Sequence, residues 1–217
     1  MRNSFLCTLL VLLSVPLVSA QPAAAPASTR IALPAPAVTG GMTLNDTLAH
    51  RRSVRAFQAT KLTMAELSQL LWAAQGITDN QGHRTAPSAH GGYFLHLYVA
   101  QPDGFFEYIP AGHALQKLSD KDIRATLSPQ PSVKSAPIVF VVAGEYGRAA
   151  SLGGVETGQR LVNLEAGHAA ENLVLEATAL KLACVTVGGI DPKQAAQAAS
   201  LPADISPIYL IPTGHAK

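Results

Sequence analysis

Residues 164–191, LEAGHAAENLVLEATALKLACVTVGGID, decide the fold because they join a long helix, a buried strand and a glycine pair. We expect the helix over residues 157–180, where one stripe recurs at spacings of three and four. The stripe consists of Leu161, Leu164, His168, Asn172, Leu175 and Ala179. His168 is then expected to be a buried, hydrogen-bonded histidine, and Glu165, Glu171 and Glu176 form the solvent side. The strand is expected over 184–187, ending at Gly188 and Gly189.

Working outward, the remaining segments add helices and strands in mixed order. Thr63 and Glu66 have the spacing of a capping box, so a helix begins there and ends at Gly76. Residues 137–143, PIVFVVA, form a continuous apolar run that predicts a strand buried on both faces. Further helices are expected at 43–50, 120–127 and 192–200, and further strands at 96–100, 105–109 and 207–212. The order predicts an α+β domain with helices packed around a small sheet.

The first twenty residues indicate a secretory signal peptide, not part of the fold. Arg2 supplies a positive charge, residues 5–18 are almost purely apolar, and Val18, Ser19 and Ala20 end the run. A membrane anchor is the alternative, but the run is shorter than the roughly 20 residues that a spanning helix needs. We therefore expect cleavage after Ala20 and a periplasmic or secreted protein.

The organisation that follows is a signal peptide at 1–20, an Ala/Pro-rich linker or arm at 21–41, and one compact domain at 42–217. The chain has 217 residues, of which 48% are hydrophobic and 14% charged, so it can build a core. Lys+Arg number 16 against 14 Asp+Glu, without a basic stripe, which argues against nucleic-acid binding. Cleavage would leave Cys184 as the one cysteine, which we interpret as a core residue.

Three segments are candidates for chemistry. The first is RRSVRAF at 51–57, where Arg51 and Ser53 have the groups to hold a phosphomonoester while Arg55 points elsewhere. A solvated basic turn is the alternative. The second is the pair Gly188 and Gly189, whose backbone can approach a flat ligand closely. A plain turn that caps the next helix at Asp191 is the alternative.

The third candidate is the loop at 84–92, RTAPSAHGG, whose small and polar residues can lie along a planar ligand. An ordinary surface loop is the alternative. The chain has no G-x-G-x-x-G fingerprint, no P-loop, no H-E-x-x-H motif and no G-x-S-x-G elbow. Dinucleotide binding by a Rossmann turn, metal hydrolysis and serine hydrolysis are therefore not indicated.

Taken in order, these segments resemble the nitroreductase superfamily, and within it the branch of thiazole- and oxazole-forming peptide dehydrogenases. The segments that carry the likeness are RRSVRAF (51–57), LTMAELSQLLWAAQGIT (62–78), HRTAPSAHGGYFLHLYVA (83–100), residues 164–191 and PIYLIPTG (207–214). The resemblance implies a nitroreductase-like fold with a mostly antiparallel sheet, a domain-swapped homodimer, and FMN at each interface site. It also implies hydride transfer through flavin N5 to or from a small organic substrate, often with NAD(P)H as reductant.

By the same resemblance, Arg51 and Ser53 bind the FMN phosphate, Arg52 contributes mainly its backbone, and Arg55 faces the pyrimidine side of the ring. The amide of Gly188 faces N5 and that of Gly189 lies near O4. The residues expected from the opposite subunit are Pro87, Ser88 and Ala89. The sequence departs from the family where Gly92 is followed by Tyr93 and Phe94 without the usual proline, which leaves the substrate open. Whether His215 or Lys217 reaches the phosphate is open too.

Two classes of function remain. One is an exported FMN oxidoreductase, which the arginine and glycine segments favour. The other is a flavin- or ligand-binding protein on the same scaffold without redox turnover, which the export signal and the altered loop favour. No stable membrane span is expected for either.

Overall fold

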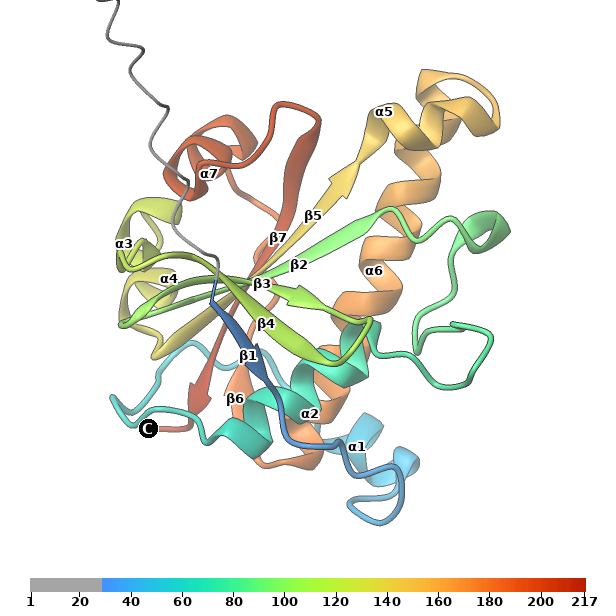
Figure 1. The fold of residues 1–217 in the computed structure, drawn as a ribbon. Coiled ribbons are helices and arrows are strands. Elements are labelled where there is room, and N and C mark those ends of the chain that lie inside the picture. The colour runs from blue at the N-terminus through green and yellow to red at the C-terminus, as the bar shows by residue number, and fades with distance from the viewer. Residues whose placement is uncertain (1–28) are drawn as a thin grey trace, which may run out of the picture.

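The computed structural model describes residues 29–217, and these form an antiparallel sheet flanked by helices (Figure 1). The predicted signal peptide lies outside the described residues. The strands are β1 (Arg30–Ala32), β2 (Leu95–Gln101), β3 (Gly104–Ile109), β4 (Ala114–Ser119), β5 (Ile138–Glu145), β6 (Leu182–Cys184) and β7 (Ile205–His215). Their order across the sheet is β1-β4-β3-β2-β5-β7-β6, and every neighbouring pair is antiparallel.

Helices cover both faces of this sheet. The helices are α1 (Leu44–His50), α2 (Met64–Gln75), α3 (Arg124–Leu127), α4 (Pro131–Ser135), α5 (Tyr146–Ala149), α6 (Val155–Ala179) and α7 (Pro192–Ala199), with short 3-10 turns η1 (Ala89–Gly91) and η2 (Ala150–Leu152). Helices α2 and α6 bury apolar side chains against one face. Residues of α3, α4 and α7 pack on the other, as Figure 1 shows.

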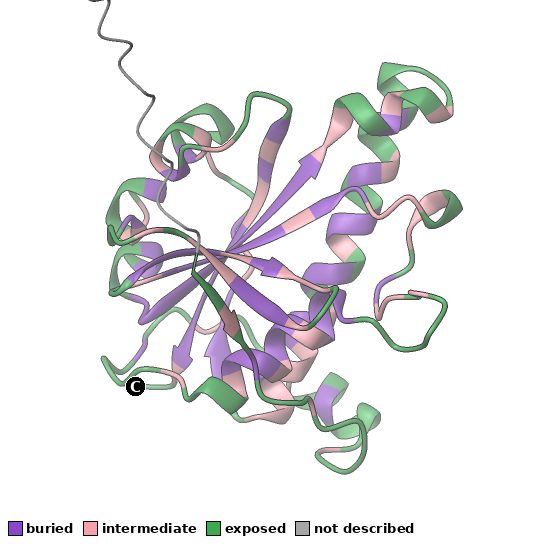
Figure 2. Cartoon of the chain, viewed as in Figure 1, coloured by how far each residue is buried: buried purple, intermediate pink, exposed green. Residues whose placement is uncertain are grey.

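Strand β5 is an interior strand of the sheet that is buried on both faces, as its apolar sequence predicts. Its side chains alternate: Phe140 and Val142 join the core under α2 and α6, whereas Val139 and Val141 join the core on the opposite face. All four are fully buried, and β5 is mostly buried along its length (Figure 2). A strand buried on both faces must be apolar at every position, which is why the sequence gives no alternating pattern here.

Helix α2 begins at the predicted capping box. The Thr63 hydroxyl accepts from the Glu66 amide at 3.2 Å, and the Glu66 carboxylate accepts from the Thr63 amide at 2.7 Å. These bonds satisfy two amides that an uncapped helix leaves without a partner. The helix buries its leucines against the sheet, so the predicted element is confirmed at both ends.

Helix α6 extends as predicted, but the face that it buries is different. The buried face is made by Gly158, Val162, Glu165, Ala166, Ala169, Ala170, Leu173, Val174 and Ala177. The predicted stripe lies beside it: Leu164 is 48% exposed and His168 is exposed, whereas Glu165 is only 2% exposed. The predictions of a buried His168 and a solvated Glu165 are therefore wrong. Alanines on the buried face let the helix approach the sheet closely, and Leu164 of the predicted stripe remains outside.

Other boundaries shift modestly. Strand β6 ends at Cys184, three residues earlier than predicted, and Val187 forms an isolated bridge to Leu210. The helix expected at 120–127 is limited to α3. Strand β4 was not predicted, and β1 pairs with it, which attaches part of the Ala/Pro-rich arm to the sheet of its own chain. Within residues 29–217, no helix combines the length and apolar character needed to cross a bilayer.

Candidate functional site

The arginine segment at 51–57 runs along the open edge of β6. Ser53 forms a parallel bridge with Cys184, and the Val54 amide donates to the Cys184 carbonyl at 2.9 Å. Further on, the Gln58 amide donates to the carbonyl of His215 at 2.9 Å. The segment is therefore held as an irregular extra strand at this edge of the sheet, and it is not a free turn.

The three arginines have different surroundings. The Arg52 guanidinium donates to the carbonyls of Ala49 at 3.1 Å and Arg51 at 2.7 Å, so it is occupied at the end of α1. The Arg51 Nε lies 3.9 Å from the Glu171 carboxylate, and its side chain is 36% exposed. Arg55 is exposed, and no hydrogen bond or ion pair holds it within the described chain. Arg51 and Arg55 are the side chains that can turn to a ligand.

The two glycines follow β6, so they lie at the same edge of the sheet as the arginine segment. The Val187 amide donates to the Leu210 carbonyl at 2.8 Å, and the chain then becomes exposed at Gly188 and Gly189. Neither glycine has a positive φ, and a Cβ at Gly189 would meet nothing within 4 Å. No acceptor within residues 29–217 takes either amide proton. The packing of this chain thus does not require glycine at 189, and both N–H groups are open.

The alternative interpretation of the glycine pair, a turn that caps the next helix at Asp191, is confirmed. Asp191 is the N-cap of α7, and its carboxylate accepts from the amides of Lys193 at 2.9 Å and Gln194 at 3.2 Å. Gln130 also donates to the Gly189 carbonyl at 2.9 Å. The turn is therefore fixed from both sides, while its amides remain free.

The arginine segment and the glycine pair lie within the length of one mononucleotide. Ser53 is level with Cys184, and Gly188 follows Cys184 by four positions. Four residues span at most about 14 Å, even when fully extended. Guanidinium groups at one end and free amides at the other are the kinds of groups that bind phosphate oxygens and the acceptors of a flat polar ring.

Comparison with known proteins decides the family. The sequence model described as the nitroreductase family matches residues 48–215, which is most of the chain. The chain belongs to the nitroreductase family. A protein of Methanocaldococcus jannaschii whose name places it with the nitroreductases is 36% identical over 182 residues, which cover 79% of this chain and 90% of the relative.

Solved structures agree with this assignment. A nitroreductase-type structure from Ralstonia eutropha is 34% identical, has a TM-score of 0.83, and covers 94% of this chain and 97% of its own. Another from Anabaena variabilis has a TM-score of 0.76 at 24% identity over 88% of this chain and 42% of its own, which shows the fold alone. The predicted nitroreductase-like fold is confirmed, and membership of this family indicates an oxidoreductase.

In this member of the family, the loop predicted to come from a second subunit is anchored on α6 of its own chain. The Ser88 hydroxyl donates to the Glu165 carboxylate at 2.7 Å and accepts from the Tyr93 amide at 2.8 Å. The Phe94 amide donates to the same carboxylate oxygen at 3.3 Å. Burial raises the pKa of Glu165. Neither Ser88 nor its neighbours Pro87 and Ala89 form a hydrogen bond to the arginine or glycine segments within the described chain.

Two residues at the C-terminus lie close to the arginine segment. The Lys217 amide donates to the Ala56 carbonyl at 3.3 Å, so Lys217 is next to Arg55. The His215 Nε2 lies 3.8 Å from the Glu66 carboxylate at the start of α2. Lys217 is thus the better placed of the two to reach a ligand on this edge.

The Cys184 thiol does not join the site chemically. It is 2% exposed, and burial raises its pKa to about 12, although the positive charge of Arg51 acts in the opposite direction. A thiol that stays protonated at neutral pH is a poor nucleophile. The sequence-based interpretation as a core residue agrees with this burial.

Sequence reasoning missed a second polar cluster, on β2 and its neighbours. The imidazole of His96 lies between two carboxylates, with Nδ1 2.8 Å from Glu107 and Nε2 2.8 Å from Glu145. Glu145 also forms an ion pair with Arg148. The one hint in the sequence was His96 itself, a polar residue in HLYVA, a strand that is otherwise mostly apolar. No pattern within one strand predicts which residues of the neighbouring strands face it.

Proposed function

We propose that this protein is an FMN-dependent oxidoreductase that binds the flavin between the arginine segment and the glycine pair. The observation that supports this most strongly is that the backbone N–H groups of Gly188 and Gly189 are exposed and have no hydrogen-bond acceptor within the described chain. Glycine at 189 is explained by neither φ nor packing within the chain, whereas a flat ligand resting on the backbone would require it. The residues present therefore fit FMN.

The roles proposed for the residues come from the family resemblance, and the surroundings of each side chain support them. Arg51 and Ser53 would hold the phosphate, because a guanidinium and a hydroxyl match its oxygens. Arg52 is occupied at the end of α1, so it contributes backbone and shape. Arg55 would face the pyrimidine edge of the ring and stabilise negative charge there. FMN, when bound, supplies two-electron hydride chemistry at its N5 atom.

A homodimer is part of the proposal. The loop at 87–89 is bonded to Glu165 of α6 through Ser88, and none of its residues forms a hydrogen bond to the arginine segment of the same described chain. We therefore propose that a second copy of the chain supplies Pro87, Ser88 and Ala89 to the flavin. The outer sides of α1 and α6 carry exposed apolar residues, among them Leu48 (54% exposed) and Leu164 (48% exposed). Exposed leucines on neighbouring helices are typical of a subunit interface.

The test of the flavin site is a visible spectrum of the purified protein with and without added FMN. The protein should absorb in the flavin bands, and replacing Arg51 and Arg55 together by alanine should strip the flavin. A matched control is Lys134→Ala, which removes an exposed charge on α4 and should leave the flavin bound. A protein that refuses FMN, or a double variant that keeps full occupancy, would contradict the proposal.

The direction of the reaction is a separate experiment. Rapid bleaching of bound flavin by NADH or NADPH would support a reductase, and bleaching by a thiazoline or oxazoline peptide would support the azoline-dehydrogenase branch.

We also propose export by a cleaved signal peptide, for which a mature chain beginning at Gln21 in the periplasm or medium is the expected result. An intracellular protein that retains Met1 would contradict export.

A further inference from the structure

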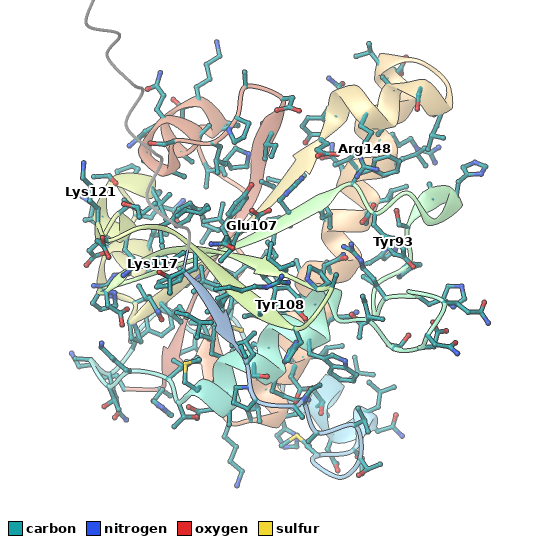
Figure 3. All side chains as sticks on the ribbon, in the orientation of Figure 1. Tyr93, Glu107, Tyr108, Lys117, Lys121 and Arg148 are labelled. Carbon is teal, nitrogen blue, oxygen red and sulfur yellow. The ribbon has the colours of Figure 1, made fainter. Side chains whose placement is uncertain are left out.

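The sheet forks between β2 and β3, and a pocket lies in the fork. The two strands pair from Tyr98 opposite Glu107 to Gln101 opposite Gly104. Toward the start of β2, residues 95–97 pair only with β5, and the facing end of β3 pairs only with β4. The resulting pocket has a volume of about 230 Å³. Figure 3 shows Tyr93 and Arg148 at the outer end of β2, with Glu107 and Tyr108 on β3.

Two side chains in this pocket are incompletely paired: the Gln75 amide nitrogen lacks an acceptor, and the Arg84 guanidinium lacks a counterion among the described residues. Gln75 is 2% exposed and lines the pocket, and its Nε2 has no hydrogen-bond partner among the described residues. The orientation of this amide is fixed, because the Arg84 guanidinium donates to its Oε1 at 2.9 Å and an arginine can only donate. A buried donor without an acceptor is costly, so the amide is suited to a ligand oxygen.

Arg84 is the second of these groups. It is half-buried, its guanidinium lies 4.4 Å from the centre of the Tyr93 ring, and no carboxylate within residues 29–217 forms an ion pair with it. Burial lowers its pKa, while the charge of Glu165 acts on it through space in the opposite direction. A half-buried cation beside an unpartnered amide favours an anionic ligand.

The other charges of the pocket limit that anion to one negative charge. Glu107 and Glu145 also line the pocket, and they are matched by His96 between them and by Arg148 on Glu145. Arg84 is thus the one charged side chain of the described lining without an ion pair, and Glu165, outside the lining, offsets part of its charge, which further disfavours a second negative charge on the ligand. A dianion such as phosphate would leave one charge uncompensated close to two carboxylates, which costs free energy at low dielectric.

The rest of the lining fits a short apolar body. Tyr93, Leu95, Leu97, Tyr108, Ile109 and Pro110 surround the volume beside the two donors. The side chains of Tyr93 and Tyr108 offer faces or edges for stacking on a planar group. Few precisely placed donors in an otherwise apolar cavity are typical of small-molecule sites.

We propose that the fork between β2 and β3 binds a small planar monocarboxylate, whose oxygens accept from Arg84 and from the Gln75 amide. This site is separate from the arginine and glycine segments, so the inference goes beyond the proposed flavin function. It does not depend on that function being correct.

The test uses sodium benzoate as the probe, with binding to the full-length protein measured by calorimetry. Arg84→Gln should weaken benzoate by about tenfold or more, because a charge-assisted hydrogen bond is lost. Gln75→Leu removes the donor and also the Oε1 that accepts from Arg84, and it should weaken binding too; circular dichroism of the variant checks that it folds. Lys134→Gln, an exposed charge elsewhere, should leave the affinity unchanged.

Two further arms separate this site from others. The Arg51→Ala, Arg55→Ala double variant should bind benzoate as well as the parent, whether or not it holds a flavin. Benzamide and phosphate should bind much more weakly than benzoate, which distinguishes a monocarboxylate site from an apolar pocket or a general anion site. The proposal is overturned if benzoate fails to bind at millimolar concentrations, if both fork variants bind it normally, or if the arginine double variant loses it.

Discussion

His96 is the residue whose protonation state the structure determines most directly. Both of its ring nitrogens lie 2.8 Å from a carboxylate oxygen, one on Glu107 and one on Glu145. Carboxylates only accept, so both nitrogens must donate, and only the imidazolium can do this. The hydrogen bond with Glu107, helped by that with Glu145, raises the pKa of His96, although burial acts in the opposite direction.

The raised pKa predicts how stability depends on pH. A histidine whose pKa is higher in the folded state stabilises the fold fully below its unfolded pKa of about 6.5 and loses this contribution as pH rises through the folded value. His96→Gln should therefore destabilise the protein most in mild acid and progressively less at alkaline pH. Urea unfolding of both proteins over a pH series measures the difference.

A background variant provides the control for this prediction. In a chain that already carries Glu107→Gln and Glu145→Gln, the His96 substitution should give a difference that no longer depends on pH. An unchanged pH dependence in that background would assign the effect to other titrating groups. The same outcome would remove the argument for an imidazolium.

At the scale of elements, the close approach of α6 to the segment before it depends on one glycine. A Cβ built on Gly158 would lie 2.6 Å from the Ala150 amide nitrogen and 2.8 Å from the Ala149 carbonyl carbon. These atoms are backbone, so they cannot swing aside as a flexible side chain can. Gly158 is therefore needed for the packing of α5 and η2 on the start of α6.

We predict that Gly158→Ala lowers the free energy of unfolding by about 1–3 kcal/mol, the usual cost of overpacking. Gly147→Ala in α5 is the matched control, because nothing lies within 4 Å of its Cβ position. That change should be neutral or stabilise by up to about 1 kcal/mol, since alanine favours helix. Chemical denaturation measures both, and equal effects would contradict the packing argument.

The elements show which patterns sequence alone can interpret. Strand β5 and helix α2 are predictable because their signals are local: a continuous apolar run and a capping box. Helix α6 has two possible faces. The sequence offers a stripe of leucines and a stripe of alanines, and the alanines face the sheet because their small size permits close approach. Which face is buried depends on the distance between the helix and the sheet, and the sequence of one segment does not determine that distance.

Strand β4 and the second polar cluster show the same limit. β4, ALQKLS, is short and mixes polar with apolar residues, so it becomes a strand only through pairing with β3 and β1. The arginine and glycine segments could be predicted as a site because each is continuous in sequence. His96 and its two carboxylate partners come from three different strands, and the Arg84–Gln75 pair joins a loop to a helix.

At the scale of the whole molecule, the outer side of α6 suggests a second copy of the chain. Leu164 is 48% exposed there, and α1, which packs on the same helix, exposes Leu44 at 65% and Leu48 at 54%. Figure 2 shows that α1 is mostly exposed. Exposed leucines cost free energy in water at about 25 cal/mol per Å², so covering them favours association.

We predict that the protein is a dimer by light scattering and that Leu164→Glu shifts it to the monomer, because a charge would be buried at the interface. Leu118→Glu is the matched control: Leu118 is also 48% exposed but lies on β4, on a different element of the fold. The control should stay dimeric and keep bound flavin, whereas the Leu164 variant should lose both. A monomeric parent protein, or a Leu164 variant that remains dimeric, would place the interface elsewhere and leave the loop at 87–89 without a flavin to cover.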